Sequence, residues 1–189
     1  ILPTSLSIGY LAVDGNNERV ATGGIGESEC DGGYFCSGGD VAECDTGHFC
    51  PPGSSSPSPC TRGSFNSATA QSECASCSPG TYQDDEGQTS CLQCLSGRQC
   101  PDDGMSEPAL CPKGSYQPSS GETACLACEG GSYQDEEGQT SCKSCRAGSF
   151  CTAGAPAETA CPQGTFCLAN SILPTSLSIG YLAVDGNNE

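Results

Sequence analysis

Eighteen cysteines among 189 residues place the strongest constraint on what this chain can fold into. The cysteines lie between residues 30 and 167, and every other one opens the same tetrapeptide, C-x-x-G. Similar segments at a regular spacing are typical of proteins built from repeated structural units. We therefore divide residues 30–167 into nine modules and count positions from the first cysteine, as position 0. The modules begin at Cys30, Cys44, Cys60, Cys77, Cys94, Cys111, Cys128, Cys145 and Cys161.

The modules hold too few aliphatic side chains for an ordinary hydrophobic core. From residue 30 to residue 167 there are four leucines, one valine, five phenylalanines and no isoleucine. Cysteine makes up close to a tenth of the chain, which is the composition of an extracellular disulfide scaffold. The sequence therefore predicts a small disulfide-rich fold, mostly irregular with short β-hairpins. About nine one-disulfide modules would form an elongated stack, with a short β segment at the repeat junction.

Two kinds of module differ in the place of the second cysteine. It stands at position 6 in short modules and at position 14 in long ones, and an aromatic residue usually occupies position 5, where the module at Cys94 has Gln99. The simplest pairing joins each first cysteine to the next, although spacing by itself does not fix the connectivity. The predicted pairs are Cys30–Cys36, Cys44–Cys50, Cys60–Cys74, Cys77–Cys91, Cys94–Cys100, Cys111–Cys125, Cys128–Cys142, Cys145–Cys151 and Cys161–Cys167.

Residues 1–18 and 172–189 are identical, ILPTSLSIGYLAVDGNNE, which gives a period of 171 residues. The predicted organisation is a cysteine-free β segment over residues 1–29, the modules over 30–167, and a junction over 168–189. Alternating side chains predict a strand from about Leu6 to Val13, followed by an Asp14-Gly15 turn and a short return over 19–22. The polar residues 23–29 indicate a linker.

The period indicates how copies would be joined. Either many copies occur in tandem in one chain, or separate subunits join end to end. The cysteine-free segment holds the aliphatic and β-branched side chains that the modules lack, so we expect it to be the joint. Between separate subunits, its strand would add to a neighbour's sheet. The candidate assembly residues are Leu6, Ile8, Tyr10, Leu11 and Val13.

One long module carries the pattern of a known family. Cys77-Ser-Pro-Gly-Thr-Tyr82, Gly87 and Cys91-Leu-Gln-Cys94 have a near copy from Cys128 to Cys145. Over about residues 30–167 the pattern resembles the ephrin-receptor-like cysteine-rich repeat and the first half of TNF-receptor cysteine-rich domains. The resemblance implies an extracellular, elongated ladder of disulfides. Such ladders occur in very large surface proteins of animals and protists, including filament proteins on algal flagella. It implies no enzyme, and residues 1–29 lie outside it.

Two kinds of metal site are alternatives for the same residues. Cys74, Cys77, Cys91 and Cys94 have the spacing of a four-thiolate zinc site, as do Cys125, Cys128, Cys142 and Cys145. The remaining ten cysteines and the common C-x-x-G frame favour disulfides. The acidic turns at 84–86 and 135–137 carry calcium-type ligands but lack the alternating oxygen pattern of a dedicated loop. We therefore expect solvated turns, no metal and no cofactor.

A segment rich in Ser and Pro precedes Cys60. This composition is typical of O-glycosylated stalks, and its Ser-Pro pairs, like Ala155-Pro156, resemble hydroxyproline glycosylation sites of algal wall proteins. A plain loop is the alternative. We expect covalently attached glycans, and the candidate residues are Ser54, Ser55, Ser56, Pro57, Ser58 and Pro59.

Charge and composition argue against several classes of function. The net charge of −17 predicts that the protein binds neither nucleic acid nor an anionic membrane. His48 is the one histidine, and with all cysteines paired no nucleophile and base can be assembled, so we expect no enzyme. We predict a structural repeat of an extracellular or cell-surface filament that binds its own copies. The alternative is a receptor or adhesion ectodomain that binds a protein or glycan ligand.

Overall fold

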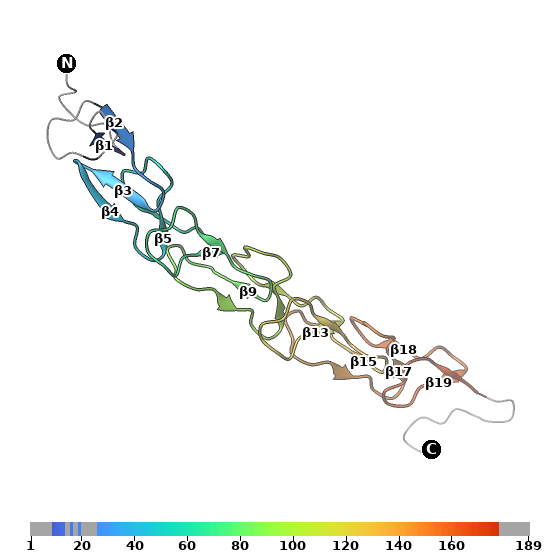
Figure 1. The fold of residues 1–189 in the computed structure, drawn as a ribbon. Helices are drawn as coiled ribbons and strands as arrows, with labels where there is room; N and C mark the ends of the chain where they lie inside the picture. The colour runs from blue at the N-terminus through green and yellow to red at the C-terminus, as the bar shows by residue number, and fades with distance from the viewer. Residues whose placement is uncertain (1–8, 14–15, 17–18, 20–25, 178–189) are drawn as a thin grey trace. The chain divides into compact units, whose positions relative to one another are not determined.

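The computed structural model describes residues 9–13, 16, 19 and 26–177. Within these residues all regular secondary structure consists of short β-strands, which pair as ten two-stranded sheets. The chain divides into unit 1 (Ile1–Leu92 and Asp102–Glu107) and unit 2 (Gln93–Pro101 and Pro108–Glu189). Figure 1 follows the strands of each unit in chain order, from blue to red. The fold class is therefore the predicted one, disulfide-rich and mostly irregular with short hairpins.

The strands are short throughout, and most contain two residues. Unit 1 holds β1 (Tyr10–Val13), β2 (Gly26–Glu29), β3 (Tyr34–Ser37), β4 (Asp40–Glu43), β5 (His48–Phe49), β6 (Ser58–Pro59), β7 (Ser64–Phe65), β8 (Ala75–Ser76) and β9 (Thr81–Tyr82). Strand β10 (Leu92–Gln93) lies where the units divide. Unit 2 holds β11 (Arg98–Gln99), β12 (Ala109–Leu110), β13 (Ser115–Tyr116), β14 (Leu126–Ala127), β15 (Ser132–Tyr133), β16 (Lys143–Ser144), β17 (Ser149–Phe150), β18 (Thr159–Ala160), β19 (Thr165–Phe166) and β20 (Thr175–Ser176).

Disulfides take the place of an aliphatic core in both units. Nine of them join the same pairs of cysteines that the spacing predicts, from Cys30–Cys36 to Cys161–Cys167. The first cysteine of every module except the last is at most 1 % exposed. Each module is therefore built around its own sulfur atoms, as a chain so poor in leucine and valine requires.

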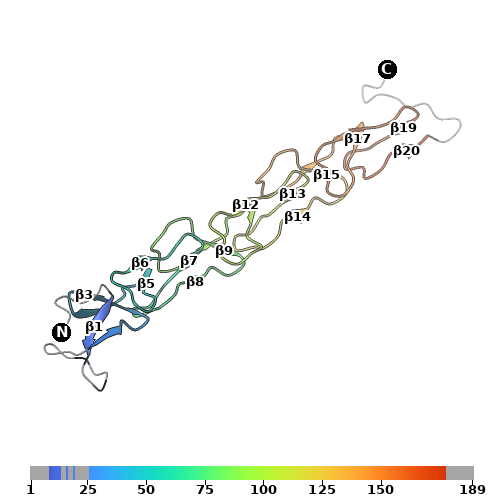
Figure 2. The same cartoon turned by 90° about the horizontal axis from the view of Figure 1, so that it is seen from above.

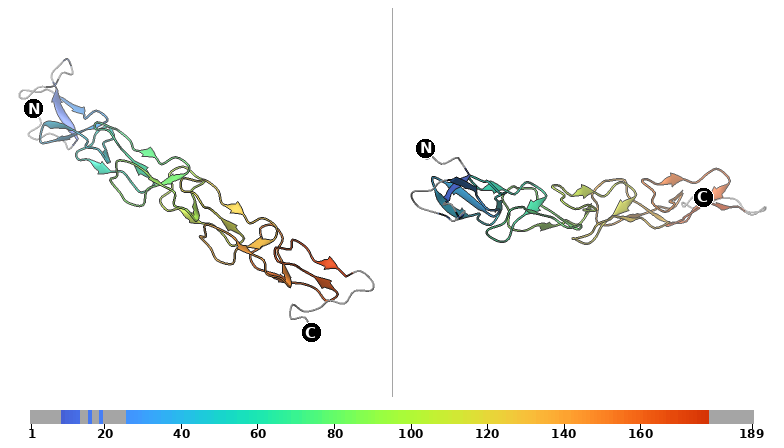
Figure 3. Two further views of the ribbon diagram at one scale, coloured as in Figure 1. Left: turned by 90° about the horizontal axis from the view of Figure 1, so that it is seen from below. Right: turned by 45° about the horizontal axis from the view of Figure 1, so that its top comes forward.

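The hairpins follow one rule of register. The residue at position 4 pairs with the residue that precedes the next module, as in His48↔Pro59 before Cys60 and Ser132↔Ser144 before Cys145. The aromatic residue at position 5 lies next to it on the same strand. Figures 2 and 3 show these hairpins from further directions within each unit. Short and long modules thus have the same hairpin, although their second cysteines lie eight positions apart.

Both kinds of module also turn at the same point of the chain. A residue with positive φ occupies position 9 or 10 in each module from Cys44 onward. Six of these residues are glycines, and the others are Ala70 and Asn170, the two non-glycine residues with positive φ in the described part of the chain. The left-handed backbone conformation is unfavourable for residues that carry a Cβ. The backbone path of a module is therefore constrained by more than its disulfide.

The segment before Cys30 departs from the sequence prediction. Strand β1 covers Tyr10–Val13 of the predicted 6–13 strand, while residues 6–8 lie outside the described residues. Val13 pairs with Arg19 in an isolated bridge, at the start of the predicted return, of which residues 20–22 are not described. The linker predicted over 23–29 is wrong for its second half, because Gly26–Glu29 forms β2 and pairs with β1. Strand pairing uses backbone N–H and carbonyl groups and does not need apolar side chains. The polar side chains of residues 26–29 therefore did not indicate a strand.

Candidate assembly interface

Each C-x-x-G tetrapeptide folds into a tight turn. The N–H at position 4 donates to the carbonyl at position 1, for example from Thr81 to Ser78 over 3.0 Å. The glycine between them has positive φ, as the third residue of a type II turn requires. A hydroxyl at position 4 donates to the same carbonyl, as Thr81 Oγ1 does to Ser78 over 2.6 Å. His48 occupies this position, with its Nδ1 3.2 Å from the carbonyl oxygen of Thr46.

Adjacent modules are joined by backbone hydrogen bonds of four recurring kinds. Between the modules at Cys111 and Cys128, Cys128 N–H donates to Gly114 O over 2.9 Å, and Gly114 N–H donates to Gln134 O over 2.7 Å. In addition, Gly138 N–H donates to Cys111 O over 2.8 Å, and Gln117 N–H donates to Gln139 O over 3.0 Å. The same four bonds join the modules at Cys44 and Cys60. They form a continuous ladder in each unit, which we call the backbone ladder.

The backbone ladder also brings modules two apart into contact. The glycine of one C-x-x-G turn faces the turn carbonyl of the second module along the chain, as Gly47 faces Gly87, Gly63 faces Gly104 and Gly114 faces Gly154. A Cβ at any of these three glycines would overlap that carbonyl oxygen. Glycine is therefore required at this position for two reasons: the positive φ, and the close approach of another backbone segment.

Position 6 carries residues that the sequence reasoning missed. Short modules have their second cysteine there, whereas long modules have Asn66, Gln83, Gln117 or Gln134. These amides are 2–7 % exposed. The Gln134 Nε2 donates to Ser141 O over 2.6 Å, and its Oε1 accepts the Glu136 N–H over 3.1 Å. Gln83 and Gln117 make the same two kinds of bond. Their signal in the sequence was an amide at position 6 of every long module.

We expect Gln134→Ala to lower the free energy of unfolding of its module by about 1–3 kcal/mol, because the Ser141 carbonyl and the Glu136 N–H lose the buried amide as their partner. Gln139→Ala is the matched control, since that side chain is only partly buried and its Nε2 reaches Glu137 O at 3.4 Å. Hydrogen exchange read by mass spectrometry over residues 128–145 measures the difference. Equal protection in the two variants would show that the buried amide has no such role.

Lys143 and Arg146 form ion pairs in the described part of unit 2. The Lys143 Nζ lies 2.6 Å from Asp135 Oδ1, and the hydrogen bond between them lowers the pKa of Asp135. The Arg146 Nη2 lies 2.6 Å from Glu158 Oε2, and this hydrogen bond lowers the pKa of Glu158. The side chains of Lys143 and Arg146 are 43 % and 81 % exposed. The Glu158 side chain is only 9 % exposed, whereas both side chains of the Lys143–Asp135 pair are well exposed. A pair exposed on both sides contributes little to stability, so the Lys143–Asp135 pair does not replace a disulfide.

The residues proposed for metal binding are used otherwise. Cys74 and Cys77 belong to different disulfides, with Cys60 and Cys91, so their sulfurs are not the free thiolates that zinc binds. The three acidic residues at 84–86 are exposed, and Asp135 of the second acidic turn binds Lys143. Among the described residues, no group of three His, Cys, Asp or Glu side chains has the arrangement of a metal site.

The candidate glycosylation segment lies partly at the surface. Ser56, Ser58 and Pro59 are exposed, and Ser54, Ser55 and Pro57 are partly buried. The Ser54 hydroxyl donates to the Pro51 carbonyl, and Ser58 and Pro59 form β6. Glycosylation at this segment stays a prediction, for which Ser56 and Ser58 offer the most accessible hydroxyls.

Of the candidate assembly residues, Leu6 and Ile8 lie outside the described residues, and the other three lie on β1. Leu11 is 6 % exposed and Val13 is 5 % exposed. Leu11 packs with Cys30 and Cys36, against which Tyr34 and Val41 also pack. The structure thus places Leu11 against the first cysteine module of its own chain, whereas the sequence suggested a surface for a neighbour.

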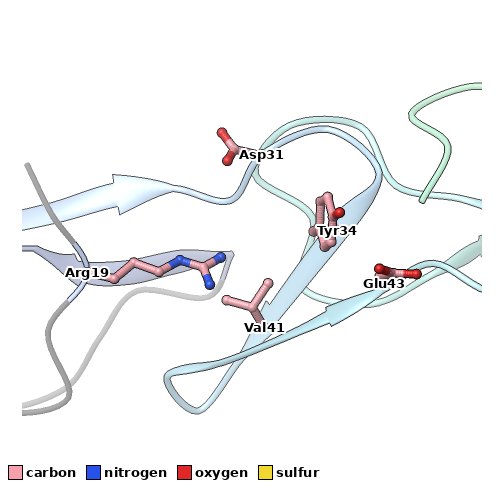
Figure 4. A pocket seen from close by; sticks show the side chains of 5 residues that line it. All are labelled: Arg19, Asp31, Tyr34, Val41 and Glu43. Atoms are coloured by element: carbon pink, nitrogen blue, oxygen red, sulfur yellow. The ribbon is translucent and has the colours of Figure 1, made fainter.

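An open hollow of about 450 Å³ lies beside this cluster in unit 1. Figure 4 shows its lining side chains, Arg19, Asp31, Tyr34, Val41 and Glu43. Its lining carries two carboxylates and one guanidinium. The hollow is a polar surface feature at the side of β3 and β4.

Comparison with known proteins identifies one part of the chain. Residues 63–108 match the family described as tyrosine-protein kinase ephrin type A/B receptor-like. This match confirms, over those residues, the resemblance stated from the C-x-x-G pattern. No curated protein sequence matches the chain. The described residues include no helix long and apolar enough to cross a membrane.

Proposed function

Since residues 63–108 carry an ephrin-receptor-like cysteine-rich segment, which is an extracellular disulfide-rich module, we propose that this chain is a structural repeat of an extracellular filament. Its partner is a further copy of the same 171-residue period, joined in tandem or end to end. The role needs no catalytic residue, cofactor or membrane. Glycans attached at the Ser/Pro segment would cover the surface of a cell-surface array.

One observation carries this proposal, namely the recurrence of the same four backbone hydrogen bonds between successive modules. An interface made of backbone groups repeats wherever the turn glycines repeat, so modules can be added without a new side-chain contact. The identical segments at 1–18 and 172–189 show that the whole set of modules also repeats, with a period of 171 residues. Together these features favour a stack that grows along one direction.

Electron microscopy of the native material tests the proposal. We expect filaments with an axial repeat that corresponds to one 171-residue period. Denaturing, reducing gels then separate the two modes of joining, because a single species near 19 kDa excludes a covalent tandem. Isolated short particles that bind a defined protein or glycan would instead support a receptor or adhesion ectodomain. The polar hollow beside β3 and β4 is the feature that favours this second candidate.

A further inference from the structure

The cysteine-free segment has the layout of a short module. Residues 6–15, LSIGYLAVDG, align without a gap with CDTGHFCPPG at 44–53 and CRAGSFCTAG at 145–154. In this alignment Leu6 and Ala12 stand at the two cysteine positions, and Leu11 stands at the aromatic position. Leu6 itself lies outside the described residues, but Gly9 to Val13 are described and can be compared with the modules.

Gly9 makes the contacts of a C-x-x-G glycine. Its φ is +83°, and its carbonyl accepts the Cys30 N–H over 2.9 Å. The equivalent bond from Cys44 to Gly33 is also 2.9 Å. A Cβ at Gly9 would overlap the carbonyl oxygen of Gly53, which is the relation that other turn glycines have to the module two places on. Gly9 is thus already part of the backbone ladder.

The hairpin β1–β2 obeys the register of the cysteine modules. Tyr10 pairs with Glu29, the residue before Cys30, as Tyr34 pairs with Glu43, the residue before Cys44. Leu11 follows Tyr10 on its strand as Phe35 follows Tyr34. The burial of Leu11 against the Cys30–Cys36 disulfide is therefore a contact between adjacent modules.

The second copy of the segment begins in the same register. Thr165 pairs with Ser176, which makes the following residue, Leu177, the first position of another module. The Leu177 N–H accordingly points to the carbonyl of Gly164, the preceding turn glycine, over 3.4 Å. Leu177 is the counterpart of Leu6, one period later. Leucine thus occupies a position that is cysteine in nine modules.

Apolar side chains are exposed near the last described residues of unit 2. The turn glycines Gly148 and Gly164 are exposed, whereas the equivalent Gly47, Gly63 and Gly114 are buried. Phe166 is 39 % exposed, whereas every other aromatic residue at position 5 is buried or partly buried. Leu168, Ile172 and Leu173 are 55–69 % exposed nearby. A group of exposed apolar side chains of this kind is a candidate contact surface.

We infer that the cysteine-free segment is a tenth module, in which a leucine and an alanine replace the disulfide, and that the backbone ladder runs through it into the next copy of the period. The continuation into a next copy rests on the proposed function; the module itself does not. Burial of Leu11 and Val13 stabilises this module in place of a cross-link. The period therefore contains nine modules that a reductant weakens and one that it leaves unchanged.

The test is to restore the missing disulfide in the full chain. Leu6→Cys with Ala12→Cys places cysteines at positions 0 and 6, and Leu177→Cys with Ala183→Cys does the same in the second copy. We expect each pair of substitutions to yield a tenth disulfide after oxidative folding, with the nine native disulfides retained. Peptide mapping without reduction and a count of free thiols give the result.

Shifted pairs serve as controls. Leu6→Cys with Val13→Cys, and Leu177→Cys with Val184→Cys, move the second sulfur by one residue and so to the opposite face of a strand. These variants should retain two free thiols. The inference is wrong if neither restored pair closes, or if the shifted pairs close equally well. Because the bridge forms within one chain, this outcome is independent of whether filaments are found.

Discussion

Gly63→Ala is expected to unfold a large part of unit 1. Gly63 has a φ of +80°, and a Cβ there would overlap the carbonyl oxygen of Gly104. The left-handed conformation costs an alanine about 1–2 kcal/mol, and forced overpacking adds about 1–3 kcal/mol. Because Gly63 also holds the Cys77 and Gln83 backbones through its carbonyl and N–H, its displacement weakens the ladder on one side. Hydrogen exchange across residues 44–92 should show lost protection in several modules.

Gly121→Ala is the matched control for the steric part of this effect. Gly121 has a φ of +81°, and no described atom lies within 4 Å of the position that its Cβ would take. The control therefore keeps the conformational cost and lacks the overlap. The effect of Gly121→Ala is measured in the modules around residue 121, and that of Gly63→Ala in residues 44–92. If the two variants lose hydrogen-exchange protection to the same extent in these regions, the close approach of Gly63 and Gly104 is not what stabilises adjacent modules.

Removing the Cys77–Cys91 disulfide by Cys77→Ala with Cys91→Ala should cost about 3 kcal/mol. Closing a loop of about 15 residues removes this much free energy from the unfolded chain in the loop-entropy estimate. Few aliphatic contacts are present to compensate, since Leu92 beside the bridge is 44 % exposed. Denaturant titration followed by exchange at residues 77–91 measures the loss.

The short Cys145–Cys151 disulfide provides the comparison. Its sequence separation is 6 residues against 14 for Cys77–Cys91, so the same estimate gives a slightly smaller loss of about 2.4 kcal/mol for Cys145→Ala with Cys151→Ala. A near-zero effect in both variants would mean that the backbone ladder alone holds the modules. A much larger effect in the short module would mean that its disulfide also positions the carbonyl of Cys151, which accepts the Gly131 N–H over 2.8 Å.

Several features were predictable because covalent geometry ties them to spacing. A C-x-x-G frame with a second cysteine at position 6 or 14 favours the simplest pairing, in which each first cysteine bonds to the next one. Nine pairs therefore follow from the simplest rule. Other features were not predictable. Gln134 is a polar residue like many surface glutamines, and only the fold shows that its amide is buried and doubly bonded.

The cysteine-free segment also has one feature that was predictable from the sequence and one that was not. Its strand was predictable over Tyr10–Val13 from alternation, but the partner strand at Gly26–Glu29 was not, since its polar side chains resemble a linker. Leu11 looked like a surface for a neighbouring copy because it is aliphatic in a chain with few such residues. The structure places it on the Cys30–Cys36 disulfide instead. An apolar side chain predicts burial without saying against what.

The sequence by itself determined the nine modules and the period of 171 residues, because cysteine and glycine recur at fixed positions. It predicted the pairing of the cysteines without fixing it. Only the tertiary structure decided how modules meet. The four bonds of the backbone ladder join N–H and carbonyl groups that every residue carries, so no residue type records them. For that reason Leu177 is recognised as the first residue of a module from the pairing of Thr165 with Ser176 and from its N–H, which is directed at Gly164.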